Sequence, residues 1–222
     1  MSTIRHALIM AAGRGLRMMP LTDSIPKPMV TLDGTTLISR GIDFLKKNIE
    51  QVHITVGYKG NMVAEHVTAQ GVNSIFNTDG HGNAWWVYHT LLKHLDEPVL
   101  VLTCDNIVEL DIALLTREYN AFGAPPCLVV PVPPVNGLEG DYIFQENNVV
   151  TELSRTKVSG IYCSGIQILN PAAVNRLTHP TDNFYQLWSE LIAQQQLYCS
   201  TIYPSRWTAI DTMEQLKNLS GE

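Results

Sequence analysis

The most chemically informative part of the sequence is a loop of small residues followed by two cations. Four small residues leave room for phosphate oxygens to reach backbone N–H groups: Ala11, Ala12, Gly13 and Gly15. Arg17 then offers a planar guanidinium that suits phosphate. Lys27 is a compact charge on a backbone that Pro26 and Pro28 restrict. Together these residues predict a site for a chain of phosphates.

Two commoner nucleotide motifs do not fit this loop. The pattern G-x-G-x-x-G requires a glycine at position 18, which is Met18, and the pattern G-x-x-x-x-G-K is absent. A simple tight turn would also explain the two glycines, and a lone Lys27 would ordinarily be a solvated surface charge. The combination with Arg17 and the flanking prolines favours phosphate binding over both of these interpretations.

Two aspartates follow apolar, strand-like runs and are candidates to bind a metal ion. Asp105 comes after the run 99–103, and Asp211 comes after the run 207–210. Phosphoryl chemistry on a triphosphate uses a divalent cation, and Mg²⁺ prefers one or two protein carboxylates together with water and phosphate oxygens. We therefore expect Asp105 and Asp211 to hold Mg²⁺. The alternatives are a strand-ending turn at Asp105 and a helix-capping pair of Asp211 with Glu214.

The first hundred residues alternate between strand and helix patterns. Strands are expected at 7–10, 52–56, 74–76 and 99–103, and helices at 36–47, 62–67 and 84–94. Parallel strands need crossover connections, so this alternation predicts an α/β fold with a doubly wound, Rossmann-like, mostly parallel sheet and helices on both faces. Such folds bind ligands at the carboxyl ends of the strands, where the glycine loop and Asp105 both fall.

The second half of the chain is richer in strands. Strands are expected at 127–132, 142–145, 149–153, 161–169, 200–202 and 207–210, and helices at 172–177, 185–195 and 212–219. The chain contains no internal repeat, low-complexity segment or clear linker. We therefore predict a single domain over residues 1–222, with a small β-rich insert at roughly 131–165.

Composition and charge narrow the range of partners. The chain has 222 residues, 45% of them hydrophobic, which suffices for a sizeable core. Its 15 Lys and Arg are scattered among 21 Asp and Glu and leave a net charge of −6, so we expect no nucleic-acid partner. No apolar run approaches the roughly 18 residues of a membrane span, and residues 1–5 lead directly into a strand pattern. We expect no membrane partner and a cytoplasmic location.

The segment from Ala11 to Met29 resembles the signature of the sugar-phosphate nucleotidylyltransferases, usually written GxGxRxxPxTxxxPKPM. The matching stretches are 11–17 (AAGRGLR), 20–22 (PLT) and 26–29 (PKPM). The resemblance implies a doubly wound α/β domain that joins a nucleoside triphosphate (NTP) to a phosphorylated acceptor and releases pyrophosphate. It also implies that Arg17 and Lys27 are catalytic and that Asp105 and Asp211 bind the metal.

The same resemblance assigns the nucleotide base and the acceptor to particular residues. It places the base beside Asn77 and Gly82, in a segment that precedes a helix pattern. The implied acceptor-binding residues are Gly140, Glu152, Lys157 and Gly165. Relatives carry a lysine directly after the glutamate that stands at Glu152, and because this chain lacks it, Lys157 or Arg155 is the candidate replacement. A solvated strand residue is the alternative for Glu152.

These assignments predict a Mg²⁺-dependent nucleotidylyltransferase. Its partners would be an NTP, with pyrimidines favoured because the Ala11–Ala12 start resembles pyrimidine-using members, and a small phosphorylated acceptor. The first expectation for that acceptor is a sugar 1-phosphate, which would give an NDP-sugar and pyrophosphate. Nothing in the sequence fixes the oligomeric state.

Three alternatives stay open from the sequence. Four aromatic residues could hold a quaternary ammonium by cation–π attraction, as in a cytidylyltransferase for phosphocholine, or could simply pack in the core: Trp85, Trp86, Tyr88 and Trp207. Departures from the family pattern at 82–86 and 152–154 are compatible with a non-catalytic, nucleotide-sensing subunit. A Rossmann oxidoreductase is a third possibility, which Met18 disfavours.

Overall fold

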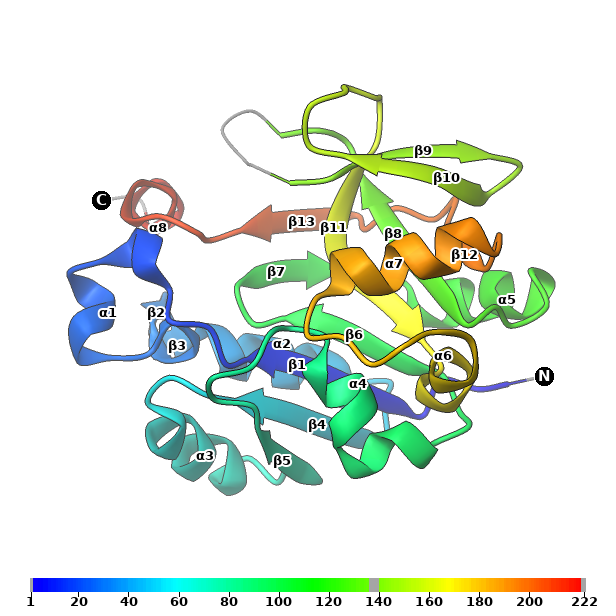
Figure 1. Ribbon diagram of the computed structural model, residues 1–222. Coiled ribbons are helices and arrows are strands. Elements are labelled where there is room, and N and C mark those ends of the chain that lie inside the picture. The colour runs from blue at the N-terminus through cyan, green and yellow to red at the C-terminus, as the bar shows by residue number, and fades with distance from the viewer. Residues whose placement is uncertain (1, 136–139, 221–222) are drawn as a thin grey trace.

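A nine-stranded sheet runs through the chain, whose computed structural model describes residues 2–135 and 140–220 (Figure 1). In spatial order its strands are β5 (Ser74–Asn77), β4 (Gln51–Val56), β1 (His6–Ala11), β6 (Val99–Thr103), β11 (Tyr162–Leu169), β8 (Cys127–Val132), β12 (Leu197–Cys199), β10 (Val149–Ser154) and β9 (Tyr142–Glu146). The first four strands pair in parallel, as expected when each is followed by a crossover.

Helices cover both faces of this sheet. One face carries α2 (Leu37–Lys46), α3 (Gly60–Ala69) and α5 (Ile112–Ala121), and the other carries α4 (Trp85–His89), α6 (Pro171–Leu177) and α7 (Phe184–Ala193). Strand β1 shows why two cores form: Ala7 and Ile9 belong to the first core and Leu8 to the second, because successive side chains of a strand point to opposite faces. The predicted Rossmann-like α/β fold is confirmed.

The β-rich second half extends the main sheet. Strand β11 is antiparallel to both β6 and β8, β12 is parallel to β8, and β10 joins the hairpin β9-β10 to β12. The hairpin lies at the top of Figure 1. Both ends of the predicted insert at 131–165 thus belong to long strands of the main sheet, and its residues 136–139 lie outside the described part of the chain.

Two short ribbons and a third cluster of apolar residues bind the N-terminal segment to the C-terminal helix. The ribbons pair β2 (Thr31–Leu32) with β3 (Thr35–Thr36) and β7 (Asn106–Glu109) with β13 (Arg206–Ala209). The cluster contains Met18, Val30 and Leu37 from the N-terminal segment, with Ile210 and Leu216 near or within α8 (Met213–Ser220). This cluster fixes the segment that carries Arg17 and Lys27 beside Asp211.

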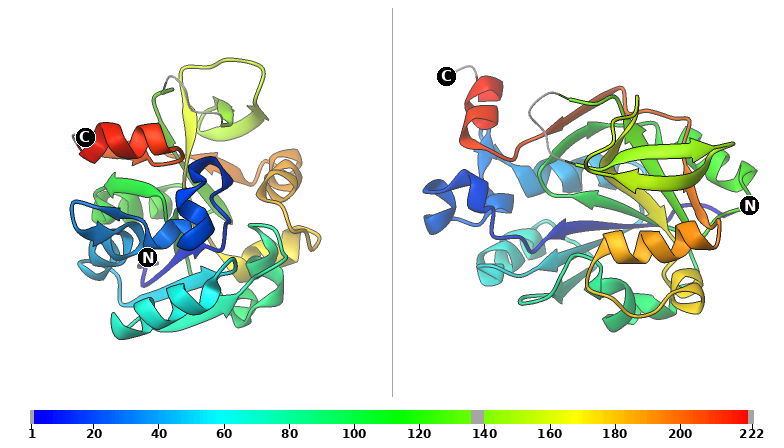
Figure 2. Two further views of the ribbon diagram at one scale, coloured as in Figure 1. Left: turned by 90° about the vertical axis from the view of Figure 1, so that its left-hand side faces the viewer. Right: turned by 45° about the horizontal axis from the view of Figure 1, so that its top comes forward.

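The same N-terminal segment holds three single-turn helices, which are η1 (Leu16–Met18), α1 (Leu21–Ser24) and η2 (Lys27–Met29). The left view of Figure 2 turns the side of the molecule that carries α8 and the N-terminal segment toward the viewer.

Some predicted elements differ from those observed. The helix expected at 84–94 is split into α4 and the short helix η3 (Leu91–His94), because Thr90 is extended between them and its hydroxyl accepts from the Leu92 N–H. The strand expected at 200–202 lies at 197–199 instead. The sequence patterns did not predict β7 and α5, although Asp111 accepts a hydrogen bond from the Leu114 N–H in the manner of an N-cap.

The helices of the structure also bear on the membrane expectation. Across residues 2–135 and 140–220, none has both the length and the apolar character needed to cross a bilayer.

A pair of histidines lies between β1 and β4, away from the glycine loop. The rings of His6 and His53 stack with centroids 5.4 Å apart, and His6 Nδ1 lies 3.1 Å from His53 Nε2. His53 Nδ1 also lies 2.6 Å from the Ser74 hydroxyl. Burial, together with the neighbouring His6, lowers the pKa of His53 to about 4. The native protein therefore holds His53 neutral at pH 5.

We predict that this histidine makes the protein less stable as the pH falls from 7 to 5. The unfolded chain takes up a proton on His53 below a pKa of about 6.5, whereas the folded chain does so only near the value of about 4, so folding loses about 2 kcal/mol over that interval. Urea unfolding at pH 7 and pH 5 measures the loss. The His53→Gln variant should show a weaker pH dependence, and an equal dependence in both proteins would contradict the prediction.

Candidate active site

The glycine loop and Asp105 lie at the same edge of the sheet because β1 and β6 are parallel neighbours. Met10 of β1 pairs with Thr103 of β6, and the Cys104 N–H donates to the Met10 carbonyl at 3.1 Å. Parallel strands end at the same edge, and this is where α/β folds bind ligands. The loop that begins after Ala11 and the turn that holds Asp105 therefore face a common space.

The ribbon of β7 and β13 brings Asp211 to this edge. Ala209 pairs with Asn106 in antiparallel register, and the Ile210 N–H donates to the Asp105 carbonyl at 3.0 Å. The turn after β6 and the end of β13 are thus joined by backbone hydrogen bonds. Because the sequence patterns did not predict β7, they could not predict this contact.

Lys27 lies between the two aspartates. Its Nζ is 2.5 Å from Asp105 Oδ2 and 2.8 Å from Asp211 Oδ1. The three side chains are largely buried, with exposed fractions of 10% for Lys27, 19% for Asp105 and 14% for Asp211. Arg17 adds a second cation from the open side, since its Nη2 lies 2.8 Å from Asp211 Oδ1 while its side chain is 58% exposed. We call Lys27, Asp105 and Asp211 the ionic cluster.

The contacts within the ionic cluster keep Lys27 and Asp105 charged. Burial alone would lower the pKa of Lys27, but the attraction and hydrogen bonds of Asp105 and Asp211 outweigh it, so the pKa is raised. Burial would likewise raise the pKa of Asp105, yet the Lys27 ammonium lowers it below its usual value. Cys104, next to Asp105, stays a neutral thiol because burial raises its pKa. The cluster is therefore one cation between two carboxylates at neutral pH.

The two glycines of the loop have different roles. Gly15 has a φ of +63°, and a Cβ there would lie 2.8 Å from the Lys27 Cβ, so both the backbone conformation and the packing on Lys27 require glycine. A Cβ at Gly13 would meet nothing within 4 Å. Gly15 thus positions Lys27, whereas Gly13 leaves the loop open toward a ligand.

The predicted phosphate contact of Ala11 needs a correction. Ala11 is buried, and its N–H donates to the Thr55 hydroxyl at 3.3 Å, so it does not face a ligand. The Ala12 carbonyl accepts from the Tyr58 N–H at 3.1 Å, and Ala12 itself lines a cavity beside the loop. Of the four small residues, Ala12 and Gly13 remain at the open surface of the site.

The predicted capping pair of Asp211 with Glu214 is not formed. Instead the Gln215 N–H donates to the Thr212 hydroxyl at 3.2 Å, and Gln215 Oε1 accepts from the N–H groups of Asp211 and Thr212. This is a capping box of Thr212 with Gln215. The T-x-x-Q spacing could have revealed it, and it leaves the Asp211 carboxylate for the ionic cluster.

The donor set of the ionic cluster suits a hard divalent cation. Oδ1 of Asp105 is buried and has no hydrogen-bond partner within the described parts of the chain. Within residues 2–135 and 140–220, no group of three or more His, Cys, Asp or Glu side chains is arranged so that it could hold a metal ion. Asp105 and Asp211 would therefore supply two carboxylates, and the other ligands would come from water and phosphate, as Mg²⁺ prefers.

The small cavity that Ala12 borders lies next to the glycine loop. It has a volume of about 160 Å³ and is lined by Met10, Ala12, Gly13, Thr55, Thr78, His81, Gly82, Asn83 and Trp86. Gly82 is needed here for packing, because a Cβ at this position would lie 2.1 Å from the Asp182 carbonyl oxygen. Gly82 thus lines the same cavity as Ala12 and Gly13, and its contact with a base stays a prediction. Asn77 is not among the residues that line the cavity, and its Oδ1 accepts from the Asp79 N–H at 3.0 Å.

The four predicted acceptor residues lie in two places. Glu152 on β10 pairs with Lys157 after β10 at 2.8 Å, and the Lys157 side chain is largely exposed whereas that of Glu152 is partly buried. Arg155, the other candidate cation, is 3.0 Å from Asp141. Gly165 has a φ of +80° within an irregular part of β11, and a Cβ there would approach Thr103 at 3.3 Å. Of these residues, Gly165 therefore lies beside the turn that carries Asp105.

Gly140 supports the structure near the hairpin. A Cβ at this position would lie 2.6 Å from the Tyr162 ring, which is too close for any other residue type. Tyr162 in turn packs edge-on against Tyr142, with ring centroids 4.9 Å apart. The absence of a side chain at Gly140 thus permits the close packing of these aromatic rings.

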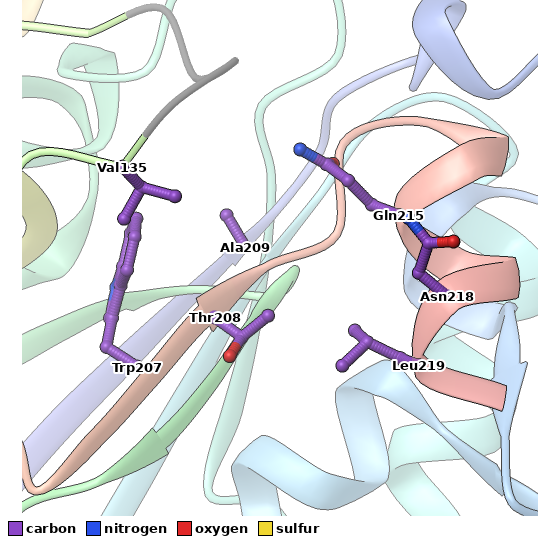
Figure 3. A pocket seen from close by; sticks show the side chains of 7 residues that line it. All are labelled: Val135, Trp207, Thr208, Ala209, Gln215, Asn218 and Leu219. Carbon is purple, nitrogen blue, oxygen red and sulfur yellow. The ribbon is translucent and has the colours of Figure 1, made fainter. Parts of the chain in front are cut away.

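A second cavity, of about 260 Å³, lies between β13 and α8 (Figure 3). Its lining consists of Val135, Trp207, Thr208, Ala209, Gln215, Asn218 and Leu219. The Trp207 ring stands beside Val135 in Figure 3, and its N–H donates to the Ser164 carbonyl at 3.0 Å. Gln215 connects this cavity to the backbone of Asp211.

The aromatic residues do not surround one site. Trp86 and Tyr88 are buried in the core on the face of α4, α6 and α7, whereas Trp207 packs against the core on the opposite face of the sheet. Trp85 is stacked between His81 and His89, with ring centroids 4.2 and 4.8 Å away. Of the two alternatives for these four rings, the cation–π cage is therefore not formed, and Trp86, Tyr88 and Trp207 pack in or against the cores.

Comparison with known proteins agrees with this architecture. The sequence model for the MobA-like NTP transferase domain matches residues 7–195. The mannose-1-phosphate guanylyltransferase catalytic subunit beta of Drosophila melanogaster is 27% identical over 206 residues, which cover 87% of this chain and 56% of that protein. The chain spans about half the length of the curated relatives it matches.

Solved structures share the fold at low sequence identity. A putative glucose-1-phosphate thymidylyltransferase from Bacillus anthracis matches with a TM-score of 0.80 at 17% identity, over 97% of this chain and 94% of that one. The inositol-1-phosphate CTP transferase from T. maritima matches with a TM-score of 0.77 at 15% identity, over 99% and 96%. The family match over residues 7–195 is decisive, and the chain belongs to the family of MobA-like NTP transferase domains.

Proposed function

We propose that the protein is a nucleotidylyltransferase that joins an NTP to a sugar 1-phosphate and releases pyrophosphate. The observation that carries the proposal is the ionic cluster beside the open loop at Gly13. Buried charges of this kind contribute little net stability, so a role in binding phosphate accounts for them better. Curated relatives are named as sugar-1-phosphate guanylyl- and uridylyltransferases, which supports this acceptor class.

The reaction needs positioning and charge compensation more than a base. An oxygen of the acceptor phosphate attacks the α-phosphorus, and the bond from that phosphorus to the β-phosphate oxygen breaks, so pyrophosphate leaves with the electron pair. The acceptor phosphate is already ionised and needs no proton removed. Arg17, exposed at the mouth of the site, would bind the leaving phosphates, and Lys27 would draw the two anionic reactants together. Asp105 and Asp211 would hold Mg²⁺, which when bound supplies further positive charge.

The base and the acceptor are proposed at two different parts of the site. The cavity beside Ala12, Gly13 and Gly82 is the candidate base pocket, with a pyrimidine as the first candidate base. The surface between Gly165 and the Glu152–Lys157 pair is the candidate acceptor side. Because Lys157 already pairs with Glu152, it would bind an acceptor phosphate only by leaving that partner.

Pyrophosphate release tests the proposed reaction. We expect release with Mg²⁺ when one NTP from CTP, UTP, GTP, ATP and dTTP meets one acceptor from a panel of sugar 1-phosphates and phosphocholine. The Asp105→Asn variant should lose at least about 100-fold in rate, because it removes a charge that acts on the transition state. Asp111→Asn is the matched control, since Asp111 caps α5 away from the site and asparagine caps equally well. NTP binding without turnover would instead favour a nucleotide-sensing subunit, and no NTP binding would contradict the proposal.

A second prediction concerns Lys27 and the metal. The variant Lys27→Met removes the cation that pairs with Asp105 and leaves only the exposed Arg17 beside Asp211, so we expect it to lose about 3 kcal/mol of folding stability in the absence of Mg²⁺. If Asp105 and Asp211 bind a divalent cation, millimolar Mg²⁺ should restore part of that stability, because ligand binding to the native state stabilises it. Thermal and urea unfolding with and without Mg²⁺ measure both effects.

The control for this prediction is a lysine in an exposed ion pair. Lys157→Met removes the partner of Glu152 and should change stability by less than about 0.5 kcal/mol, with or without Mg²⁺. If Lys27→Met were as stable as wild type, the Lys27 ammonium would not be the group that offsets the two buried carboxylates. If the loss occurred and Mg²⁺ restored none of it, Asp105 and Asp211 would not be a metal site.

A further inference from the structure

The cavity between β13 and α8 has mostly apolar walls and no charged side chain (Figure 3). Of the seven residues that line it, four are apolar and three are polar, and none is ionisable. Burying a charge without a partner is far more unfavourable than burying a neutral polar group, so the cavity suits a neutral ligand. Its volume of about 260 Å³ is near the lower end of ligand pockets, which begin at about 300 Å³, so a single small ring would fill it.

Gln215 presents an unpaired donor to this cavity. Its Oε1 accepts from the N–H of Asp211 at 2.6 Å and from that of Thr212 at 3.0 Å. Because a backbone N–H can only donate, these contacts identify the oxygen end of the carboxamide, and the Nε2 group points the other way. Figure 3 shows this nitrogen extending from α8 toward Ala209 and Val135. Within the described residues it has no hydrogen-bond partner and is not among the buried unpaired atoms, so a molecule in the cavity can reach it.

Trp207 presents the face of its ring to the same cavity. Its indole N–H is already used, since it donates to the Ser164 carbonyl at 3.0 Å. In Figure 3 the ring is seen edge-on beside Val135, with one face turned toward Ala209 and α8. The hydrogen bond fixes the ring, so packing a ligand against this face costs little conformational entropy. The cavity therefore combines a fixed apolar surface on β13 with a free donor from α8.

A sugar ring has the chemistry that this lining requires. A pyranose has faces of C–H groups, and its rim carries hydroxyl groups that both donate and accept hydrogen bonds. A C–H face would pack on Trp207, and a hydroxyl oxygen of the rim would accept from Gln215 Nε2. Asn218 follows Gln215 by three residues on the same side of α8 and adds a second carboxamide at the rim. A hydrocarbon of the same size would leave the Gln215 amide without a partner.

We propose that the cavity between β13 and α8 is a binding site for one neutral sugar ring, held by donation from Gln215 Nε2 and by the face of Trp207. Such a ring can be a free sugar or the sugar part of the acceptor, and only the second source rests on the proposed function. The site adjoins the ionic cluster, because the Gln215 oxygen holds the backbone N–H of Asp211, whose carboxylate pairs with Lys27. Binding to it is measured without turnover, so its test is separate from that of the proposed reaction.

Titration with neutral sugars in the absence of nucleotide tests the proposal. In protein labelled with ¹⁵N-tryptophan, the chain's four tryptophans give four indole signals, and the Trp207 signal is the one missing from the variant Trp207→Phe. We expect at least one of glucose, mannose, galactose and N-acetylglucosamine to move the Trp207 signal at millimolar concentration. The signals of Trp86 and Trp188 should stay in place, because both rings are buried in the core on the other face of the sheet.

Two matched variants separate the donor from the helix cap. Gln215→Met removes both the Nε2 donor and the oxygen that caps α8, whereas Thr212→Ala removes only the other half of the capping box. We expect both variants to lower the Tm by a similar amount. Only Gln215→Met should also weaken sugar binding, by about fivefold to tenfold, as the loss of one hydrogen bond to a ligand implies. A third variant, Ala209→Leu, fills the cavity with its side chain and should abolish binding.

The 1-phosphate of the bound sugar identifies the source of the ring. If it displaces the free sugar, the cavity holds the sugar part of the acceptor; if both bind together, the cavity holds a second sugar molecule, and either result supports the site. A Trp207 signal that no sugar or sugar 1-phosphate moves, or binding to Ala209→Leu as tight as to wild type, would overturn the inference. Pyrophosphate release is measured separately, so the proposed reaction stands or fails on its own result.

Discussion

Three charged side chains from distant parts of the chain meet within hydrogen-bonding distance, and the arrangement of the site depends on them. Lys27 lies in the N-terminal segment, Asp105 follows a central strand of the sheet, and Asp211 precedes the last helix. A largely buried ammonium needs carboxylate partners, and a largely buried carboxylate needs a cation. The three segments are therefore held to one geometry, since moving any of them would leave a charge unpaired.

The rest of the fold supplies the means to hold this geometry. The parallel pairing of β1 with β6 puts the glycine loop next to Asp105, and the β7-β13 ribbon ties Asp211 to the same turn. Gly15 lets the loop backbone pack directly on Lys27, and the apolar cluster around Met18 and Leu216 binds the N-terminal segment to α8. Buried ion pairs often stabilise less than apolar packing would, which supports the proposal that this cluster is a preorganised phosphate site.

The fold and the charged residues of the site could be predicted from the sequence, but the contacts between these residues could not. Alternating strand and helix patterns sufficed for the α/β sheet, because each parallel strand needs a crossover. The contact of Asp211 with Asp105 depends on β7, a four-residue strand with only local signals, so it could not be predicted. The phosphate contact of Ala11 was misassigned because its N–H donates to Thr55 on the neighbouring strand, a tertiary contact. The base contact of Asn77 stays a prediction, and its Oδ1 accepts from the Asp79 N–H two residues along the chain.

The coupling of Lys27 and Asp105 as a largely buried pair is the central claim, and a double-mutant cycle tests it most directly. Urea unfolding of wild type, Lys27→Met, Asp105→Asn and the double variant gives the coupling free energy. Removing both partners eliminates the uncompensated charge that each single variant leaves, so we expect the double variant to be more stable than the sum of the single losses implies, by about 2 kcal/mol. Losses that add to within about 0.5 kcal/mol would contradict the claim, because the two charges would then be energetically independent.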